Sequence, residues 1–517
     1  MRTVSVFLSL AALLTATSAA PDAAAAEQLF DLVIENGRVM DPESALDAVR
    51  QVGITNGTIA AISQSGLRGR STIDARGLVV APGFIDLHWH GTDPKSHRYQ
   101  AMDGVTASFE LEIGVADVDR WYDERSGREP IHYGVAVGHV PVRMAVLGDT
   151  GEFLPSGPGA KSAIDDAQLL QIKQHIEHGL QRGAVGVGLG IVYTPAASDW
   201  ELLEVFRLAA RYKAFAHVHV RGASSAAGAG ADRERGLLEA IALSAVSGAP
   251  VHIAHINSSA QASAPRMLQI IADARARGVD ITTECYPYTA GATRIESFLF
   301  DSWYDKEDSD YAKLQWSASG ERLTRESFRK YREQGGLVLI HMNTEDMVTA
   351  TVAHPLTMIA SDGFDVRAGQ GHPRSAGTFS RILGRYVRER GVIGLMDALR
   401  KMTLMPAQRL AQRVPAMNNK GRVRIGADAD LTIFDPDTII DTATFEEPAR
   451  FSRGVVHVLV GGEAVVAHGK LRDGVLPGQA IRAAITEGST ARSELPPHAD
   501  YGANRDAADF GDLLHPH

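Results

Sequence analysis

Apolar and polar positions along the chain follow two different patterns. From about residue 30 to 74, apolar and polar residues alternate in DLVIENGRVMD and VGITNGTIAAI, which predicts short, half-buried strands. The pairs Asn36-Gly37 and Asn56-Gly57 interrupt these runs and predict tight turns. The same alternation returns at 421–435 and 455–466. Two β-rich pieces at opposite ends of the chain therefore predict one small sheet domain.

The middle of the chain has a different pattern, in which apolar runs of strand length alternate with helical stretches. These runs include AVGVGLGIVY, FAHVHV, PVHIAHI, ITTECYPY, LVLIHM and LTMIASD. Strand–helix alternation over about 250 residues or more predicts an α/β protein built on a (β/α)8 TIM barrel. We expect the barrel over residues 81–410 and the sheet domain over 27–80 plus 411–480.

Two segments do not fit either pattern. Residues 296–332 are aromatic and charged without a clean period, which favours a lid over the mouth of the barrel. Residues 481–517 are polar, contain Gly, Pro and Asp, and predict a disordered tail.

The first residues are typical of a targeting segment. Met1-Arg2 precedes an apolar run from Val4 to Leu14, and small residues follow up to position 26. This order predicts a signal peptide over residues 1–26 and export to the periplasm or the exterior. The run is shorter than the ~20 residues that span a bilayer, so we expect no stable membrane anchor, and an uncleaved anchor is the alternative.

Composition and charge narrow the classes of partner. A hydrophobic fraction of 44% and a charged fraction of 22% are ordinary for a globular protein. The net charge of −10 argues against a nucleic acid held through its phosphates, and the oligomeric state stays open. A single cysteine, Cys285, forms no internal disulfide and is predicted to be buried and inert.

Candidate chemistry lies where apolar runs end, because barrel active sites form at the carboxyl ends of the strands. His88 and His90 follow one run, and strand alternation points both to the same side, where they can bind one metal ion. His219, His255 and Asp362 close three further runs. Burying so many polar groups is unfavourable unless they are paired or ligate a metal, so the pattern predicts a metal centre.

Longer stretches carry a resemblance to a known family. They are PGFIDLHWHG, DGVTASFELEIG, RGAVGVGLGIVYTPAAS, HVHVRG, ECYPYTAG, HPRSAGTFSRILGRYVRERG and GADADLTIFDPDTIIDTATFEEP. Residues 30–475 resemble the amidohydrolase superfamily, and specifically the N-acyl-D-amino-acid deacylases, or D-aminoacylases. The resemblance implies a TIM barrel with a small composite β-sandwich domain built from both chain ends.

The resemblance also implies roles for individual residues. His219 and His255 correspond to metal ligands, and His88 and His90 to a further metal position. Asp362 corresponds to the general base and acid. One or two Zn²⁺ ions are the implied cofactor.

The chain departs from the family where the D-aminoacylases have a cysteine ligand, because it has Glu110 and Glu112 there. A carboxylate is a competent zinc ligand and can bridge two metal ions. Glu112 is the favoured ligand and Glu110 the second choice, and one of them could instead support a ligand. Trp89 and Asn257 also differ from the family pattern. The run 183–193 contains no lysine, which argues against hydantoinases and dihydroorotases.

Candidate substrate-binding residues flank these runs. Arg221 and Arg374 could grip a substrate carboxylate in bidentate fashion. Tyr288 could donate a hydrogen bond to that carboxylate or to the developing oxyanion, and His372 could orient Asp362 or contact the substrate. The alternative for each is a structural pairing with a neighbouring group.

The expected function is metal-dependent hydrolysis of the amide bond in a small N-acylated amino acid, with D-preference implied only by the resemblance. A dipeptidase or a cyclic-amide hydrolase of the same superfamily is the alternative within this class. A non-catalytic periplasmic barrel that binds a metal or a ligand is the alternative from another class.

Overall fold

The fold is taken from a computed structural model, which describes residues 28–91, 93–222, 230–366 and 370–486. The predicted signal peptide, residues 1–26, lies outside the described residues. So do residues 487–517 of the predicted tail.

Eight parallel strands follow one another around a barrel in the order of the sequence. They are β6 (Phe84–Asp86), β7 (Val105–Val115), β8 (His132–Gly138), β9 (Gly186–Gly190), β10 (Phe215–His219), β11 (Val251–Ile253), β12 (Ile281–Cys285) and β16 (Thr357–Ile359). The chain segments after β6 and β16 close the ring, since the amide of His90 donates to the carbonyl of Gly363 at 2.7 Å. The predicted (β/α)8 barrel is therefore confirmed.

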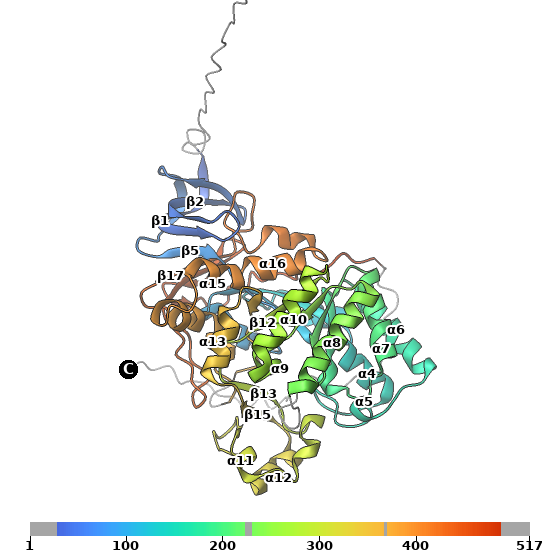
Figure 1. The fold of residues 1–517 in the computed structure, drawn as a ribbon. Helices are drawn as coiled ribbons and strands as arrows, with labels where there is room; N and C mark the ends of the chain where they lie inside the picture. The colour runs from blue at the N-terminus through green and yellow to red at the C-terminus, as the bar shows by residue number, and fades with distance from the viewer. Residues whose placement is uncertain (1–27, 92, 223–229, 367–369, 487–517) are drawn as a thin grey trace, which may run out of the picture.

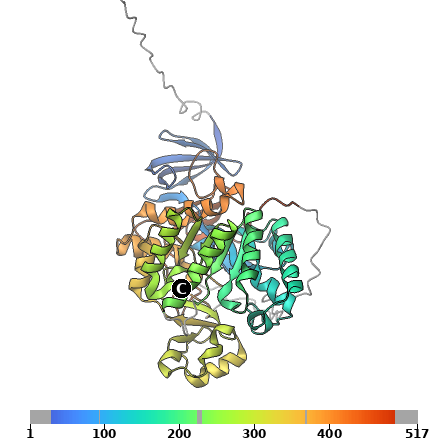
Figure 2. The same ribbon diagram turned by 45° about the vertical axis from the view of Figure 1, so that its right-hand side comes forward.

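Helices surround these strands, as Figures 1 and 2 show. The longer ones are α2 (Pro94–Met102), α3 (Val118–Arg125), α4 (His139–Leu147), α6 (Asp166–Gln181), α7 (Asp199–Arg211), α8 (Gly230–Ser247), α10 (Ala264–Ala276), α13 (Glu345–Ala353), α14 (Arg374–Arg381), α15 (Leu395–Met402) and α16 (Leu404–Ala411). Short helices are α5 (Pro158–Lys161), α9 (Ile256–Ala260), η1 (Ile191–Tyr193), η2 (Gln261–Ser263), η4 (Ile382–Glu389) and η5 (Pro415–Asn419). Ile172 and Ile176 of α6 share one core with Val187 and Leu189 of β9, so the helices bury the outer face of the barrel strands.

The sheet domain combines both ends of the chain and lies at the top of Figure 1. Its order is β20-β19-β18-β17-β5-β1-β2-β3, with β4 beside β1. The strands are β1 (Leu29–Asp41), β2 (Leu46–Thr55), β3 (Thr58–Ser63), β4 (Arg68–Asp74), β5 (Val79–Pro82), β17 (Leu431–Phe434), β18 (Val455–Val460), β19 (Glu463–Ala467) and β20 (Lys470–Leu471). The antiparallel pair β5–β17 joins the two ends, as the predicted fold class requires.

Only one of the two predicted tight turns exists. Asn56 and Gly57 have φ of 49° and 72° and connect β2 to β3, so this hairpin turn is confirmed. The prediction for Asn36-Gly37 is wrong, because both residues lie inside β1. There the register shifts between Ile34 and Gly37, and Asn36 has φ of 61°. The strand accommodates the pair as a bulge, which uses the same positive φ as a turn.

A folded insert lies between β12 and β16, at the bottom of Figure 1. It contains β13 (Ala290–Arg294), η3 (Phe298–Trp303), α11 (Asp308–Tyr311), β14 (Leu314–Trp316), α12 (Arg325–Gln334) and β15 (Leu337–His341). The run LVLIHM, predicted as part of the barrel alternation, forms β15 instead. It pairs antiparallel with β13 and β14 over a core that includes Phe300, Trp303 and Phe328. An apolar run alone does not say which sheet a strand joins.

The predicted tail begins too early. Ile481 and Ala483 are buried, and the amide of Ile481 donates to the carbonyl of Tyr133 at 2.7 Å. The amide of Ala483 donates to the carbonyl of Gly183 at 2.9 Å. Residues 481–486 are therefore part of the fold, because the barrel supplies acceptors that local sequence does not reveal.

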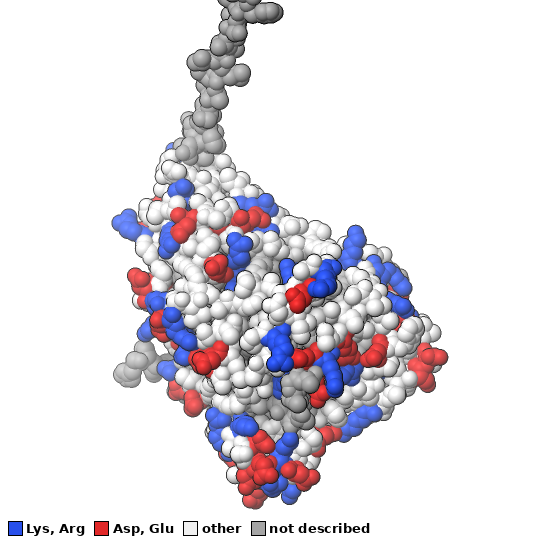
Figure 3. Space-filling view, viewed as in Figure 1, with Lys and Arg blue, Asp and Glu red and all other residues white. Residues whose placement is uncertain are grey.

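Figure 3 shows where charged side chains lie on one face of the molecule. On the face in Figure 3, acidic and basic groups are intermixed and are dense on the insert. In the described parts of the chain, we find no helix with the length and apolarity needed to cross a bilayer.

Candidate metal centre

Five barrel strands deliver acidic and imidazole side chains to one edge of the barrel. His88 and His90 follow β6, and Glu112 lies within β7. His219 ends β10, while His255 and Asp362 come shortly after β11 and β16. All of these side chains are buried. The carboxyl ends of the strands thus gather the histidines, Glu112 and Asp362 that the sequence singles out.

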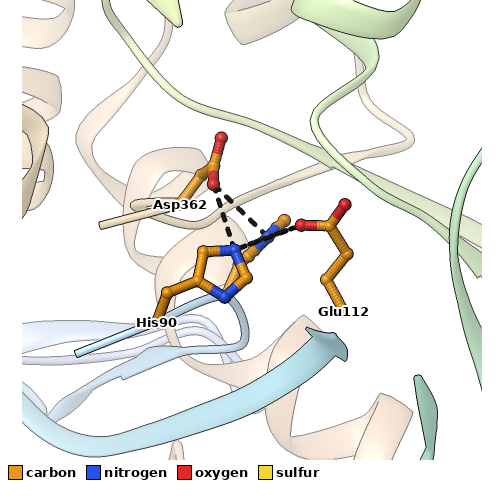
Figure 4. A group of neighbouring side chains, drawn as sticks. His90, Glu112 and Asp362 are labelled. Carbon is orange, nitrogen blue, oxygen red and sulfur yellow. Dashed lines mark hydrogen bonds and ion pairs between the residues drawn. The ribbon is translucent and has the colours of Figure 1, made fainter. Parts of the chain in front are cut away.

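The first group of ligand atoms belongs to His88, His90, Glu112 and Asp362 (Figure 4). The Nε2 atoms of His88 and His90 lie 3.0 Å apart. Oε2 of Glu112 is 2.8 Å from the first and 3.1 Å from the second, and Oδ1 of Asp362 is 3.4 Å and 3.5 Å from them. Four ligand atoms therefore converge on one point.

The other ring nitrogens of the two histidines are held by separate carboxylates. Nδ1 of His88 lies 2.5 Å from Oε1 of Glu284, and Nδ1 of His90 lies 2.7 Å from Oε2 of Glu110. If each Nδ1–H donates to its carboxylate, both Nε2 lone pairs face the same point. Such lone pairs repel one another at 3.0 Å, whereas a cation between them attracts both. The donor set therefore fits a divalent metal ion such as zinc.

Glu112 links this group to a second one. Its Oε1 lies 2.5 Å from Nδ1 of His219 and 3.9 Å from Nε2 of His255. The ligand atoms of these three residues lie within 4.8 Å of one another. One oxygen of Glu112 thus faces each group, the arrangement of a carboxylate that bridges two metal ions.

Glu110 has a different position from Glu112. Its Oε1 accepts hydrogen bonds from the amides of Ile113 and Gly114 at 3.2 Å and 3.1 Å, while Oε2 contacts His90. These bonds stabilise a bend in β7 where Gly114 has φ of 66°. The structure therefore places Glu110 as a support for His90 and not among the converging ligand atoms.

Two residues of the centre have backbone conformations that side chains rarely adopt. His255 has φ of 26° and Asp362 has φ of 51°. Conformations of this kind cost on the order of 1–3 kcal/mol each and concentrate at functional sites. The surrounding fold therefore holds these two residues in backbone conformations that they would not adopt by themselves.

Asp362 is held on its far side by Arg374. Nη1 of Arg374 lies 2.8 Å from Oδ2 of Asp362, and the guanidinium lies over the ring of Tyr286. Burial opposes ionisation of Asp362, but Arg374, His88 and His255 outweigh burial and keep its pKa below the ordinary value. Asp362 is thus a carboxylate whose Oδ1 faces the ligand group. Arg374 serves as its partner and does not line the pocket, which is the structural pairing given above as the alternative to a substrate contact.

Three other predicted substrate contacts are engaged elsewhere. The guanidinium of Arg221 bonds to Glu239 at 3.0 Å and to backbone carbonyls. The hydroxyl of Tyr288 lies 3.3 Å from Asp441. Nε2 of His372 is 2.9 Å from the carbonyl of Ala290, and its Nδ1 accepts from the amide of Arg374. The structure does not bring Arg221, Tyr288 or His372 into the pocket, because local partners take up their polar atoms.

Sequence reasoning missed Glu284, which lies in β12 beneath the centre. Its Oε1 contacts His88, and its Oε2 lies 3.0 Å from Nε2 of His252. His252 in turn contacts the hydroxyl of Thr282 at 2.7 Å through Nδ1. The side chains of Glu284 and His252, and that of His217 beside them, are almost fully buried. A glutamate inside the apolar run ITTEC was the available signal, since buried charges need partners.

A pocket opens onto the ligand atoms. His90, Glu112, His219, His255 and Asp362 form one wall, together with the hydroxyl-bearing Tyr193, Ser258 and Tyr286. Residues of the insert line another part of the pocket. The space in this pocket that is open to the centres of water molecules is about 50 Å³.

These features define a metal-dependent hydrolase on a (β/α)8 barrel. Catalytic zinc sites use histidine and carboxylate ligands, and barrel enzymes place them at the carboxyl ends of the strands. Residues 144–466, more than half of the chain, match the family described as "Amidohydrolase family". The chain belongs to this family and is an amidohydrolase.

Individual relatives match over most of their length. An N-acyl-D-glutamate deacylase of Alcaligenes xylosoxydans xylosoxydans is 28% identical over 487 residues, covering 85% of this chain and 94% of the relative. A D-aminoacylase of the same organism is also 28% identical, covering 85% and 95%. Among solved structures, the N-acyl-D-glutamate deacylase of Bordetella bronchiseptica, in complex with zinc and a phosphonate inhibitor, has a TM-score of 0.76 at 26% identity, covering 88% of this chain and all of that one.

Proposed function

We propose that this chain is a zinc-dependent N-acyl-D-amino-acid deacylase. It hydrolyses the amide bond of an N-acylated D-amino acid to a carboxylate and a free amino acid. The observation that carries the proposal is the pair of ligand groups linked by Glu112 with Asp362 beside them. The deacylase relatives, which match over nearly their whole length, support the choice of substrate.

The residues fit one or two zinc ions. His88, His90, Glu112 and Asp362 would hold one ion, and Glu112, His219 and His255 the other. Zinc bound there supplies Lewis acidity, which activates water and polarises a carbonyl group. Glu112 stands where the D-aminoacylases have cysteine, and its two oxygens allow it to serve both groups.

The proton transfers fall to Asp362. Its Oδ1 faces the ligand group, while Arg374 holds Oδ2 from behind. This carboxylate can accept the proton of the attacking water and pass it to the departing amine. Fixing one oxygen orients the other, so Asp362 needs no rearrangement between the two steps.

Hydroxyl groups on the pocket wall can stabilise the oxyanion. Burial and the nearby Glu112 raise the pKa of Tyr193 well above its ordinary value, so its hydroxyl stays protonated and can donate. Tyr286 also lines the pocket, and burial raises its pKa to about 12. We assign the oxyanion contact to Tyr193 or Tyr286, in place of the more distant Tyr288.

The test is amine release from paired N-acetyl-D- and N-acetyl-L-amino acids by the zinc-loaded enzyme, with Asp362→Asn as control. Release from the D series alone, lost in the control, is the expected result. Release from the L series would overturn the proposed preference for D-amino acids. Turnover restricted to dipeptides or cyclic amides would favour another amidohydrolase activity, and zinc binding without any turnover would favour a non-catalytic barrel.

We also propose that the protein is exported, on the strength of residues 1–26. N-terminal sequencing of the protein recovered from the periplasm or the medium tests this. A mature chain that begins near position 21 or 27 is expected, and an intact Met1 in the cytoplasmic fraction would contradict it.

A further inference from the structure

One part of the pocket wall, which includes two aromatic side chains packed against His90, is apolar. It consists of Phe153 and Leu154 from the segment after α4, Leu299, Ile340 and Met342 from the insert, and Phe364 after Asp362. Contact with such a wall is favourable for apolar groups because it removes their surface from water. A carboxylate placed there loses hydration without gaining a partner.

Arg294 is the one side chain on this wall that could offset that loss. Among the lining residues that the structure describes, it is the only lysine or arginine. Two carboxylates already engage it, however. Its Nε donates to Oε1 of Glu296 at 2.6 Å, and its Nη2 donates to Glu152. One positive charge therefore faces two negative charges.

One of the two carboxylates, that of Glu296, is also held in position by the insert. Oε2 of Glu296 accepts from the amide of Gly336 at 2.9 Å, which ties it to the insert. Glu152 is half exposed and lies next to Phe153 of the apolar wall. The side-chain carboxylate of an acidic substrate would be the third at Arg294 and would meet a guanidinium whose charge is already offset.

Sequence similarity does not decide which side chain the substrate carries. The relative that acts on N-acyl-D-glutamate and the D-aminoacylase are equally similar, at 28% identity each. The chemistry of the pocket wall can decide, because recognising an acidic side chain requires a cation that is available to it.

We infer that the substrate carries an apolar side chain, and that Glu152 and Glu296 exclude acidic side chains by neutralising Arg294. This inference rests on the proposed deacylase function. It assigns a specificity-determining role to two glutamates that are not metal ligands. The apolar side chain packs against Phe153, Leu299 and Met342 of the pocket lining.

The experiment compares kcat/KM for N-acetyl-D-leucine, N-acetyl-D-methionine and N-acetyl-D-glutamate with the zinc-loaded enzyme. The small acetyl group is constant, so only the side chain varies. We expect the apolar substrates to be preferred by more than about tenfold. Glu152→Gln and Glu296→Gln should each raise kcat/KM for the glutamate substrate several-fold, and adding Arg294→Gln should remove that gain.

Glu321→Gln is the matched control. Glu321 is an exposed glutamate of the insert that pairs with Tyr331 and does not line the pocket. This variant should leave the ratio between substrates unchanged, and thermal unfolding of all variants checks the fold.

The outcomes separate this inference from the proposed function. A preference for N-acetyl-D-glutamate, equal rates on all three substrates, or no gain in either glutamate variant would overturn the inference and leave the deacylase function standing. Absence of amine release from every acyl amino acid would overturn both.

Discussion

Replacing Glu284 with glutamine tests whether a carboxylate outside the converging ligand atoms sets the metal affinity of the centre. Glu284 accepts from His88 through one oxygen at 2.5 Å and contacts His252 through the other at 3.0 Å. Glutamine has nearly the same size but no charge, and it offers His88 only a neutral acceptor. The carboxylate both fixes the ring of His88 and raises the basicity of the Nε2 that faces the metal.

The expected magnitude follows from this role. Loss of a partner of this kind typically weakens metal binding about 10- to 100-fold. That corresponds to about 1.4–2.8 kcal/mol of binding free energy. The fold should tolerate the change, because the amide of glutamine can donate to Nε2 of His252 while the Nδ1 of His252 contacts Thr282.

The assay is competition for Zn²⁺ between the metal-free protein and a chromophoric chelator. Glu129→Gln is the control, since Glu129 is also fully buried and contacts a histidine, His97, at 2.5 Å, and neither residue belongs to a ligand group. We expect weaker zinc binding in the Glu284 variant and unchanged binding in the control. A folded Glu284→Gln protein with the zinc affinity of the original would refute the assignment.

Three further predictions concern the centre and its supports. Asp362→Asn should abolish turnover. It should also lower the free energy of unfolding, measured by chemical denaturation, by about 3 kcal/mol, because Arg374 then loses its buried partner. Equal turnover at equal zinc content would contradict the role of Asp362. Glu112→Ala should reduce bound zinc at both groups, since each of its oxygens serves one of them; elemental analysis after dialysis measures this, and unchanged stoichiometry would argue against the bridge. Gly114→Ala should destabilise the protein by more than about 1 kcal/mol, because the residue has φ of 66° and a Cβ would lie 2.7 Å from the carbonyl oxygen of Ala136. A thermal unfolding midpoint equal to that of the original protein would contradict this account of β7.

The local sequence determines several parts of the protein. Alternation places His88 and His90 on one side of a strand, and the ends of apolar runs mark His219, His255 and Asp362. These features depend on a few neighbouring residues, so they can be predicted without knowledge of the rest of the chain. The alternation of strands and helices likewise predicts the barrel, because each unit repeats the same short-range pattern.

Choices between similar residues require the tertiary structure. Glu110 and Glu112 are two apart on one strand, and the bend at Gly114 is what turns Glu110 toward the backbone and His90. The run LVLIHM has the composition of a barrel strand, yet its pairing partners lie in the insert. Composition fixes how apolar a strand is, whereas the neighbouring strands decide which sheet it joins.

Partners distant in sequence lie beyond what local patterns can predict. Glu284 lies 196 residues from His88, and Arg374 was expected to bind substrate because nothing near it in sequence identifies Asp362 as its partner. The sequence by itself determined the fold class and the residue types of the metal centre. Only the closed barrel decided which carboxylate lies among the metal ligands, which one supports a ligating histidine, and which arginine is already paired with a carboxylate. Those contacts form only when strands far apart in the chain meet at one edge of the barrel.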